Sequence, residues 1–157
     1  YDAETGESYI PYVTETSIGV DRMVLQVLSA GYQEEKLENG EERTVLSIPA
    51  PLAPVKAAVL PLVKKDGLPE IAHRIKNTLR YDYNIQYDEK DSIGKRYRRQ
   101  DAIGTPLCIT IDHQSAEDGT VTVRDRDTMR QERVHIEAIP ALVESKAGMR
   151  ALLDKLA

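Results

Sequence analysis

Two arginine-rich stretches hold the residues of this chain whose types and spacing could do chemistry. The first, Ser92 to Pro106, places four cations within five residues, namely Lys95, Arg96, Arg98 and Arg99. The second, Thr122 to Ile136, alternates carboxylates with arginines, namely Arg124, Arg126, Arg130 and Arg133. Cations bind phosphates, arginine can make paired hydrogen bonds to guanine edges, and carboxylates accept from the cytosine amino group. One interpretation is therefore a groove that binds single-stranded nucleic acid.

Each stretch also has a plainer interpretation. The first could be an ordinary solvated helix face. The second could be a network of mutual ion pairs, each contributing only ~0–1 kcal/mol at a surface. Some of these arginines would then be paired with nearby carboxylates, such as Asp101, Asp125 and Asp127. The residues alone leave both interpretations open.

The first stretch has the signals of a helix. Ser92 is a plausible N-cap, and Gly104 is a plausible residue just after the helix end. Ile93 and Tyr97 are four apart and share one side, while Lys95, Arg98 and Arg99 fall roughly opposite. The pattern predicts a helix that docks on a core with one side and presents positive charge on the other.

The remaining chemistry-bearing residues form no recognisable catalytic or metal site. The histidines, His73, His113 and His135, are scattered and have no cysteine pair beside them, so no metal site is expected. The glycine-rich phosphate loops and the HExxH zinc motif are absent. The single cysteine, Cys108, lies in an apolar run, which favours a core position over a nucleophile.

The composition is that of a globular domain, with 30% charged and 41% hydrophobic residues. One cysteine fits a reducing compartment, and no segment suggests export or a membrane span, so we expect a cytoplasmic protein. Residues 1–50 hold three cations against ten carboxylates, a net −7, which leaves +2 for the rest of a chain at −5. This asymmetry predicts two regions with different roles, and the start at Tyr1 fits a fragment of a longer protein.

Hydrophobic spacing predicts the elements of the acidic first region. The expected elements are a weak strand at Ile10–Thr14, a core-facing helix over 20–32 with Met23, Val24, Val27 and Leu28 on its apolar side, an exposed charged connection at 33–43 with a turn at Asn39-Gly40, and a β-prone segment at 44–48. The prolines that follow place the domain boundary between residues 50 and 51.

The second region alternates strand and helix patterns. The expected order is a buried strand at 55–63, a helix opened by Pro69, a strand at 84–88, the basic helix, a strand at 107–113, a loop through Asp118-Gly119, strands at 120–126 and 133–138, and a C-terminal helix from Pro140 with Leu142, Met149, Leu152, Leu153 and Leu156 on one face. This order predicts an α/β fold with a mixed, roughly five-stranded sheet flanked by helices.

Taken together, GKRYRRQDAIGTP and TVTVRDRDTMRQERV resemble the anticodon-binding domain of the glycyl-tRNA synthetase family of homodimeric class II type. Upstream, YIPYVTETSIGVDR resembles motif 3 of the catalytic domain of that family, and APLAPVKAAVLPLV resembles its lead into the C-terminal domain. The resemblance covers nearly the whole chain. It implies that residues 1–50 are a C-terminal remnant of the catalytic domain and that residues 51–157 are a class IIa anticodon-binding domain.

The resemblance also implies a function, that of a glycine–tRNA ligase. Such an enzyme attaches glycine to tRNA(Gly) through glycyl-adenylate, uses ATP with Mg²⁺ and works as a homodimer when full length. By resemblance, Glu15 and Ser17 contact glycine and Arg22 binds the ATP phosphates. Motifs 1 and 2 are absent here, so we expect the fragment alone to be inactive and to bind no cofactor.

The residues expected to bind tRNA are the dense cations of the two stretches, namely Lys95, Arg96, Arg98, Arg99, Arg124 and Arg126. We expect the helix cations to grip phosphates and the two strand arginines to reach bases. The sequence departs from the family at two places, with Ala102 in place of an acid and Leu107 in place of an aromatic residue.

Two other functions are alternatives to that of a glycine–tRNA ligase. One is a non-catalytic nucleic-acid-binding or regulatory module built on the same domain. The other is a small flavodoxin-like enzyme, which the lack of a phosphate loop after the first strand disfavours.

Overall fold

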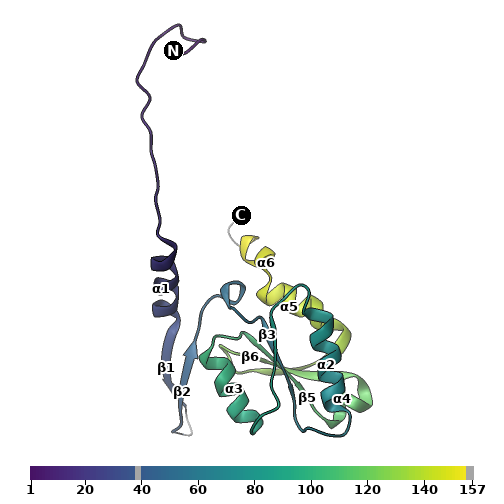
Figure 1. The fold of residues 1–157 in the computed structure, drawn as a ribbon. Helices are drawn as coiled ribbons and strands as arrows, with labels where there is room; N and C mark the ends of the chain where they lie inside the picture. Colours follow the sequence, from purple (N-terminus) through teal and green to yellow (C-terminus); the bar gives the residue numbers. More distant parts are fainter. Residues whose placement is uncertain (38–39, 155–157) are drawn as a thin grey trace.

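The computed structural model describes residues 1–37 and 40–154, and its body is a mixed five-stranded sheet with helices on both faces (Figure 1). The sheet order is β4-β3-β5-β6-β7. These strands are β3 Ala57–Pro61, β4 Ile85–Tyr87, β5 Leu107–Ile111, β6 Thr120–Asp125 and β7 Gln131–His135. Strand β3 runs parallel to β4 and β5, and β6 is antiparallel to both of its neighbours. The predicted α/β fold with a mixed, roughly five-stranded sheet is confirmed.

The remaining elements surround this sheet or precede it. They are α1 Val20–Gly31, β1 Tyr32–Lys36, β2 Glu42–Leu46, α2 Leu68–Leu79, α3 Ile93–Ala102, α4 His113–Asp118, α5 Ile139–Ala147 and α6 Met149–Leu153, with short 3-10 turns η1 Ala50–Leu52 and η2 Ile136–Ala138. Among the described residues, no helix has the length and apolar character needed to cross a membrane.

The main hydrophobic core lies on one face of the sheet, beneath α2 and α5. Because side chains alternate along a strand, Leu107, Ile109 and Ile111 of β5 point to this face. They pack there with Ile75 of α2 and Val143 of α5. The fully buried β3 confirms the strand expected from the apolar run.

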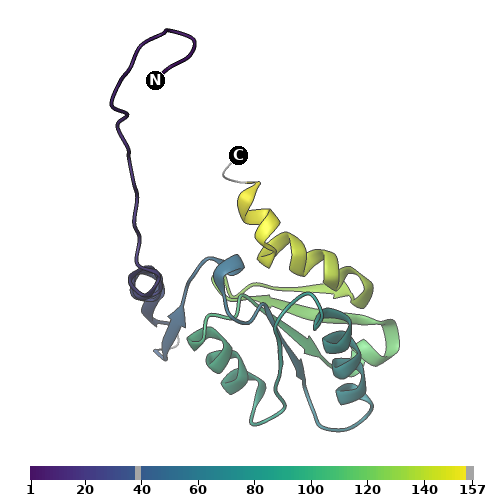
Figure 2. The same cartoon turned by 45° about the horizontal axis from the view of Figure 1, so that its top comes forward.

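Helix α3 covers part of the opposite face, which we call the α3 face. Ile93 and Tyr97 of the helix pack on Ala58, Leu60 and Cys108 of β3 and β5, as their four-residue spacing predicted. The second view shows α3 on the other side of the sheet from α2 and α5 (Figure 2).

The acidic first region differs from its prediction. Residues 10–14 have no regular structure, so the expected strand is wrong. The expected connection at 33–43 is also wrong, because β1 and β2 pair there as an antiparallel hairpin. Asn39 of the predicted turn lies outside the described residues. Burial alternates along β2, with Arg43 and Val45 buried and the residues between and before them exposed. The strand therefore packs one side against the body.

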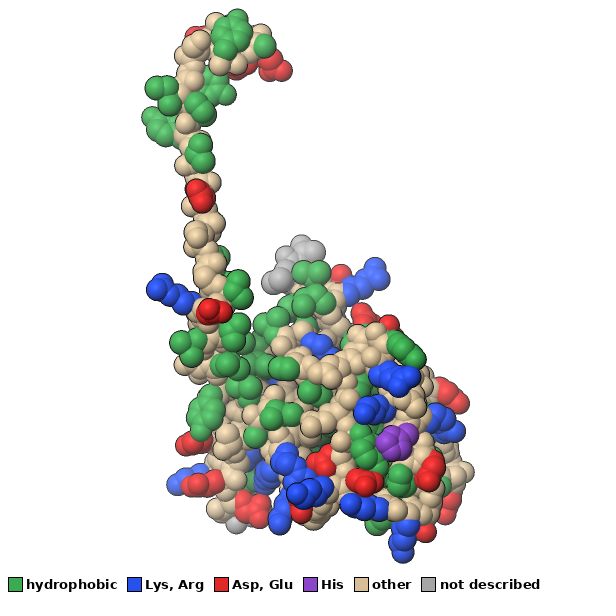
Figure 3. Space-filling view, viewed as in Figure 1, with side chains coloured by type: hydrophobic (Ala, Val, Ile, Leu, Met, Phe, Trp, Pro, Cys, Tyr) green, Lys and Arg blue, Asp and Glu red, His purple; other side chains and the backbone are tan. Residues whose placement is uncertain are grey.

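Helix α1 forms where the periodicity predicts it, but its apolar side does not face a core. Met23, Val24 and Leu28 are exposed, and Val27 is half-buried. Figure 3 shows hydrophobic side chains along α1 and the extended segment before it. Only Gly31 is buried, where a Cβ would come within 2.6 Å of Ile48 Cγ2. The prediction that this helix faces a core is therefore wrong for the described residues.

Two further differences lie in the second region. The expected loop through Asp118-Gly119 contains helix α4, capped by reciprocal hydrogen bonds between Asp112 and Ser115. The expected C-terminal helix is interrupted at Gly148, which has an extended backbone. Beyond the break, Met149 and Leu153 are exposed, so the single apolar face is wrong there. Leu156 of that face lies outside the described residues.

Candidate nucleic-acid interface

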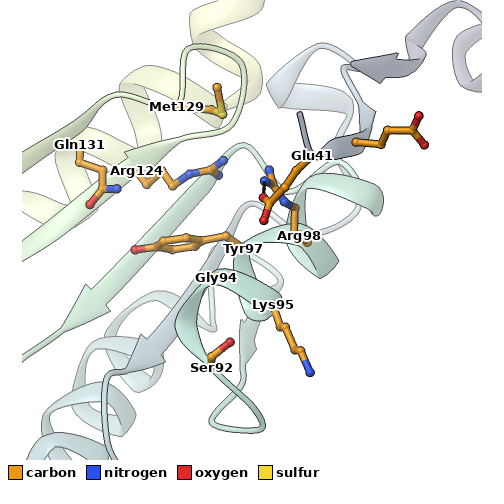
Figure 4. Close-up of a pocket in the computed structure, with 10 residues that line it drawn as sticks. Glu41, Ser92, Gly94, Lys95, Tyr97, Arg98, Arg124, Met129 and Gln131 are labelled. Atoms are coloured by element: carbon orange, nitrogen blue, oxygen red, sulfur yellow. Dashed lines mark hydrogen bonds and ion pairs between the residues drawn. The ribbon is translucent and has the colours of Figure 1, made fainter. Parts of the chain in front are cut away.

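A groove of about 730 Å³ opens between α3, the β1–β2 hairpin and the end of strands β6 and β7 (Figure 4). Its lining residues are Glu41, Glu42, Ser92, Gly94, Lys95, Tyr97, Arg98, Arg124, Met129 and Gln131. In the register of the sheet, Arg124 of β6 lies opposite Cys108 of β5 and opposite Gln131 of β7. Cross-strand partners point to the same side, so Arg124 and Gln131 belong to the α3 face. The structure thus brings both arginine-rich stretches into one hollow.

Two of the predicted helix cations line the groove and a third lies beside it. Lys95 is exposed and makes no hydrogen bond or ion pair with the other described residues. Arg98 Nη2 lies 3.1 Å from Glu41 Oε2, an ion pair that connects α3 to the hairpin. Arg99 is exposed and pairs with Asp88 and Asp91 at 2.7 and 2.9 Å. Figure 3 shows Lys and Arg side chains gathered over the position of α3.

Arg96 lies inside the molecule. Its guanidinium donates to the carbonyl oxygens of Pro61, Leu62 and Asp88, at 2.6, 3.2 and 3.2 Å. These bonds fasten α3 to the end of β3. The helical period places Arg96 between the docking side and the solvent side of α3. The bonds to the three carbonyl oxygens keep its side chain buried. A phosphate contact needs an exposed guanidinium, so the structure contradicts the position that the prediction for Arg96 required.

Arg124 forms part of the groove wall, and the buried Asp101 binds its guanidinium. Its Nη1 and Nη2 donate to the two carboxylate oxygens of Asp101 at 2.8 and 3.0 Å. Its guanidinium carbon lies 4.9 Å from the centre of the Tyr97 ring, a cation–π geometry visible in Figure 4. Burial disfavours the Arg124 charge, but the bonds and charge of Asp101 outweigh it, and the pKa of Arg124 is raised.

Arg126 is buried and does not line the groove. It donates to the Asp127 carboxylate and to the carbonyl oxygens of Gly104 and Ile48, each at 2.8 Å. Burial favours the neutral acid, but the bonds from Arg126 and Ser47 lower the pKa of Asp127. Arg124 and Arg126 are therefore paired with Asp101 and Asp127, as the ion-pair interpretation expected, but both guanidiniums are buried and not at the surface. Arg126, outside the groove lining, is not placed to reach a base.

Arg43, which was not among the predicted site residues, is the most deeply buried arginine of this region. It lies on β2, is 1% exposed, and donates from Nε to Asp101 and from Nη1 to Glu35, both at 3.0 Å. Its Nη2 donates to the carbonyl oxygen of Arg126. Asp101 is completely buried between Arg43 and Arg124. The only signal in the sequence was the position of Arg43 two residues before Val45, next to the β-prone segment 44–48.

Met129 and Gln131, which line the groove, were not predicted as site residues, and Tyr97 was predicted only as a core contact. In the structure, Tyr97 docks on the small core and also lines the groove, and its hydroxyl lies 2.7 Å from Thr110 Oγ1. Leu107, where the resemblance expected an aromatic residue, belongs to the main core on the other face. That departure therefore does not alter the groove.

Another arginine–carboxylate pair lies on the α3 face, away from the groove. Arg133 of β7 donates to both carboxylate oxygens of Asp112, at 2.5 and 2.9 Å, and to Thr120. These bonds from Arg133 lower the pKa of Asp112 to about 2. Both side chains are partly exposed.

The residues expected to contact glycine and ATP are not assembled into a site. Glu15 and Ser17 lie in the extended segment, and Arg22 lies on α1 (Figure 1). All three are exposed and bond to no other described residue. Across residues 1–37 and 40–154, no group of three or more His, Cys, Asp or Glu residues could hold a metal ion. These residues alone do not fit ATP with Mg²⁺.

Residues 56–146, which include α3 and the arginine-bearing strand β6, match the family model described as Anticodon binding domain. The chain belongs to this anticodon-binding domain family. The match leaves out β2 and therefore Arg43.

Curated relatives extend the likeness of this anticodon-binding domain chain beyond the matched domain. It is 54% identical over 146 residues to a glycine–tRNA ligase of Lachnoclostridium phytofermentans, covering 93% of this chain and 31% of the relative. It is 55% identical to that of Geobacillus kaustophilus, covering 92% and 31%, and 49% identical to that of Borrelia hermsii, covering 93% and 33%. The chain thus spans about a third of the length of these relatives.

Solved structures of two aminoacyl-tRNA synthetases share the fold. The RNA binding domain of threonyl-tRNA synthetase from Cryptosporidium parvum Iowa II has a TM-score of 0.58 at 25% identity, covering 64% of this chain and 26% of that one. Prolyl-tRNA synthetase from Cryptosporidium parvum has a TM-score of 0.59 at 19% identity, covering 72% and 30%. The second likeness supports the fold alone.

Proposed function

We propose that this chain recognises the anticodon of tRNA(Gly) as the C-terminal part of a glycine–tRNA ligase. The observation that carries the proposal is the groove in which the two arginine-rich stretches meet, within the matched anticodon-binding domain. The name of the relatives, each matched over more than 90% of this chain, supplies the amino acid. No observation favours the alternative of a non-catalytic module.

In this proposal the exposed helix cations bind the RNA backbone. Lys95 is free of ion pairs with the described residues, so a phosphate can approach it without breaking one. Arg98 and Arg99 are already paired with carboxylates, so an RNA phosphate must exchange with Glu41 or with Asp88 and Asp91. Lys95 therefore contributes most per residue to the salt-dependent part of binding.

The base-reading groups are the side chains that line the groove wall. Asp101 holds Arg124 end-on, and the Nε of Arg124 bonds to no other described residue. A guanidinium in a fixed plane can donate to a base edge with little loss of entropy. Gln131, the cross-strand neighbour of Arg124, offers both a donor and an acceptor. Arg124 is only 4% exposed but lines the groove, whereas Arg96 and Arg126 are buried outside the groove lining and have no direct role.

The activity of the parent protein follows as a further part of the proposal. We propose that the full-length protein forms glycyl-adenylate from glycine and ATP with Mg²⁺, acts as a homodimer and works in the cytoplasm. In it, Glu15 and Ser17 would contact glycine and Arg22 the ATP phosphates. The 157-residue chain should show no glycine-dependent ATP–pyrophosphate exchange, because its three residues of this site are not assembled.

The test is binding of the chain to a tRNA(Gly) transcript and to transcripts with a substituted anticodon, across a salt series. Lys95→Ala should weaken binding to every transcript and reduce the salt slope by about 1. Arg124→Lys should cost ~1–3 kcal/mol with the correct anticodon and little with a wrong one. Lys146→Ala, exposed on α5 over the other face, is the matched control. Equal binding of all transcripts by the parent chain would overturn the proposal.

A further inference from the structure

The β1–β2 hairpin precedes the matched domain in sequence, yet it forms part of the groove and of the buried network behind it. Glu41 and Glu42 line the groove, and Arg43 is among the least exposed side chains of the described chain. Just after the hairpin, Ser47 Oγ lies 2.7 Å from Asp127 Oδ1 and the Ile48 carbonyl accepts from Arg126. The hairpin and the sheet therefore share one set of polar contacts.

Asp101 is the point where the hairpin and the groove wall meet. Its Oδ1 accepts from Arg124 at 2.8 Å, and its Oδ2 accepts from both Arg124 and Arg43 at 3.0 Å. Asp101 is completely buried, so water cannot readily replace a lost partner. A carboxylate near a helix C-terminus is also unfavourable by itself, and the two arginines offset that cost. Moving Arg43 must therefore move Asp101, and Arg124 with it.

The charges indicate that Arg43 acts through geometry. Asp101 and Arg124 form a pair with no net charge. The charge of Arg43 is balanced separately, because Glu35 of the same hairpin accepts from its Nη1 at 3.0 Å. The guanidinium fork reaches three acceptors on three segments, namely Glu35, Asp101 and the Arg126 carbonyl. A lysine would keep the charge but could not hold all three.

We infer that Arg43 is a positioning residue of the RNA-binding groove, which through Asp101 sets the plane of Arg124 over the Tyr97 ring. The hairpin and the groove are then one recognition unit, although the matched domain begins after the hairpin. This inference rests on the proposed RNA-binding function of the groove. Arg43 itself touches no RNA, because it is buried behind Asp101.

The first test measures binding of an anticodon stem-loop of a glycine tRNA to Arg43→Lys, Arg124→Lys and the double variant. Arg43→Lys should weaken binding roughly tenfold in the parent chain, within the usual range for coupled neighbours. In the Arg124→Lys background the same change should weaken binding less than about twofold, because the group it positions is gone. Arg133→Lys, at the partly exposed end-on pair with Asp112, should have an equally small effect in both backgrounds.

The second test needs no variant and so does not depend on how a variant folds. Side-chain Nε–H signals of arginine are followed by ¹⁵N NMR while the stem-loop is added to the parent chain. The Arg43 signal should shift together with that of Arg124, although Arg43 has no access to RNA. A shift of Arg124 with an unchanged Arg43 signal overturns the inference.

The outcomes separate this inference from the proposed function. If the parent chain does not bind the stem-loop, the proposed function fails and the inference with it. If the parent binds and Arg124→Lys weakens binding, the RNA-binding role of the groove stands. An Arg43→Lys effect of the same size in both backgrounds, or no effect in either, then overturns the positioning role alone.

Discussion

Two of the arginine–aspartate pairs on the α3 face, Arg124–Asp101 and Arg133–Asp112, share an end-on geometry but have opposite surroundings. In each pair both carboxylate oxygens accept from one guanidinium. The side chains of Arg124 and Asp101 are 5% and 0% exposed, whereas those of Arg133 and Asp112 are 28% and 26% exposed. Water can solvate a surface charge that loses its partner, but it cannot solvate a buried one. The comparison teaches that burial, which local sequence does not encode, decides what such a pair contributes.

The largest effect should come from removing the shared buried carboxylate. Asp101→Asn leaves the guanidiniums of Arg43 and Arg124 without the charge between them. We expect the free energy of unfolding to fall by about 3–5 kcal/mol, as for other broken buried pairs. Urea unfolding followed by circular dichroism measures it. If the free energy of unfolding fell by less than about 1 kcal/mol, burial would not distinguish the contribution of this pair from that of Arg133–Asp112.

A smaller effect should come from the matched change at the surface pair. Asp112→Asn should lower the free energy of unfolding by about 1 kcal/mol at neutral pH, because water screens this pair. The Asp112 pKa of about 2 lies below its ordinary value of about 3.9, so the ionised form stabilises the fold.

The pH dependence of that contribution has a defined sign. It is fully present above about pH 4 and is lost as pH falls toward 2. The stability difference between the parent and Asp112→Asn should therefore shrink over this window. Asp118 also has a pKa of about 2 because Thr120 bonds to it, but it is present in both proteins and cancels. A difference that stays constant from pH 5 to pH 2 would contradict the assignment.

The smallest effect should come from salt. A double-mutant cycle on Asp112 and Arg133 should give a coupling of roughly 0.5–1 kcal/mol at low salt and almost none at about 1 M, where screening acts over roughly 3 Å. The same cycle on Asp101 and Arg124 should change less, because Asp101 is completely buried. Equal salt sensitivity of the two couplings would remove the distinction drawn from burial.

Local patterns predicted the parts of the fold that depend on neighbours in the chain. The spacing of Ile93 and Tyr97 predicted the docking side of α3, and the apolar run predicted β3. Helix α4 was missed because its cap pairs Asp112 with Ser115, a weaker sequence signal than Ser or Thr followed by Glu. The periodicity of α1 predicted a helix but could not show that its apolar side lies uncovered here.

The site was predicted less completely because burial depends on distant partners. Arg43 bonds to Asp101, 58 residues away, and Arg126 bonds to the Ile48 carbonyl, 78 residues away. No window of sequence shows such contacts. Lys95 needed no partner and stays a predicted phosphate contact, whereas Arg96 found three carbonyl acceptors and became internal.

The hairpin also determines how much chain must travel together if this domain is moved to another protein. Cutting at the predicted boundary after residue 50 would strip Arg43 from Asp101 and remove Val45 and Ile48, which are almost wholly buried. The left-handed backbone at Gly104 is also fitted to this segment, since a Cβ there would lie 2.9 Å from the Leu46 carbonyl oxygen. The portable unit therefore begins at Tyr32, with the first strand of the hairpin, and shuffling that respects only the matched domain would transplant an incomplete part.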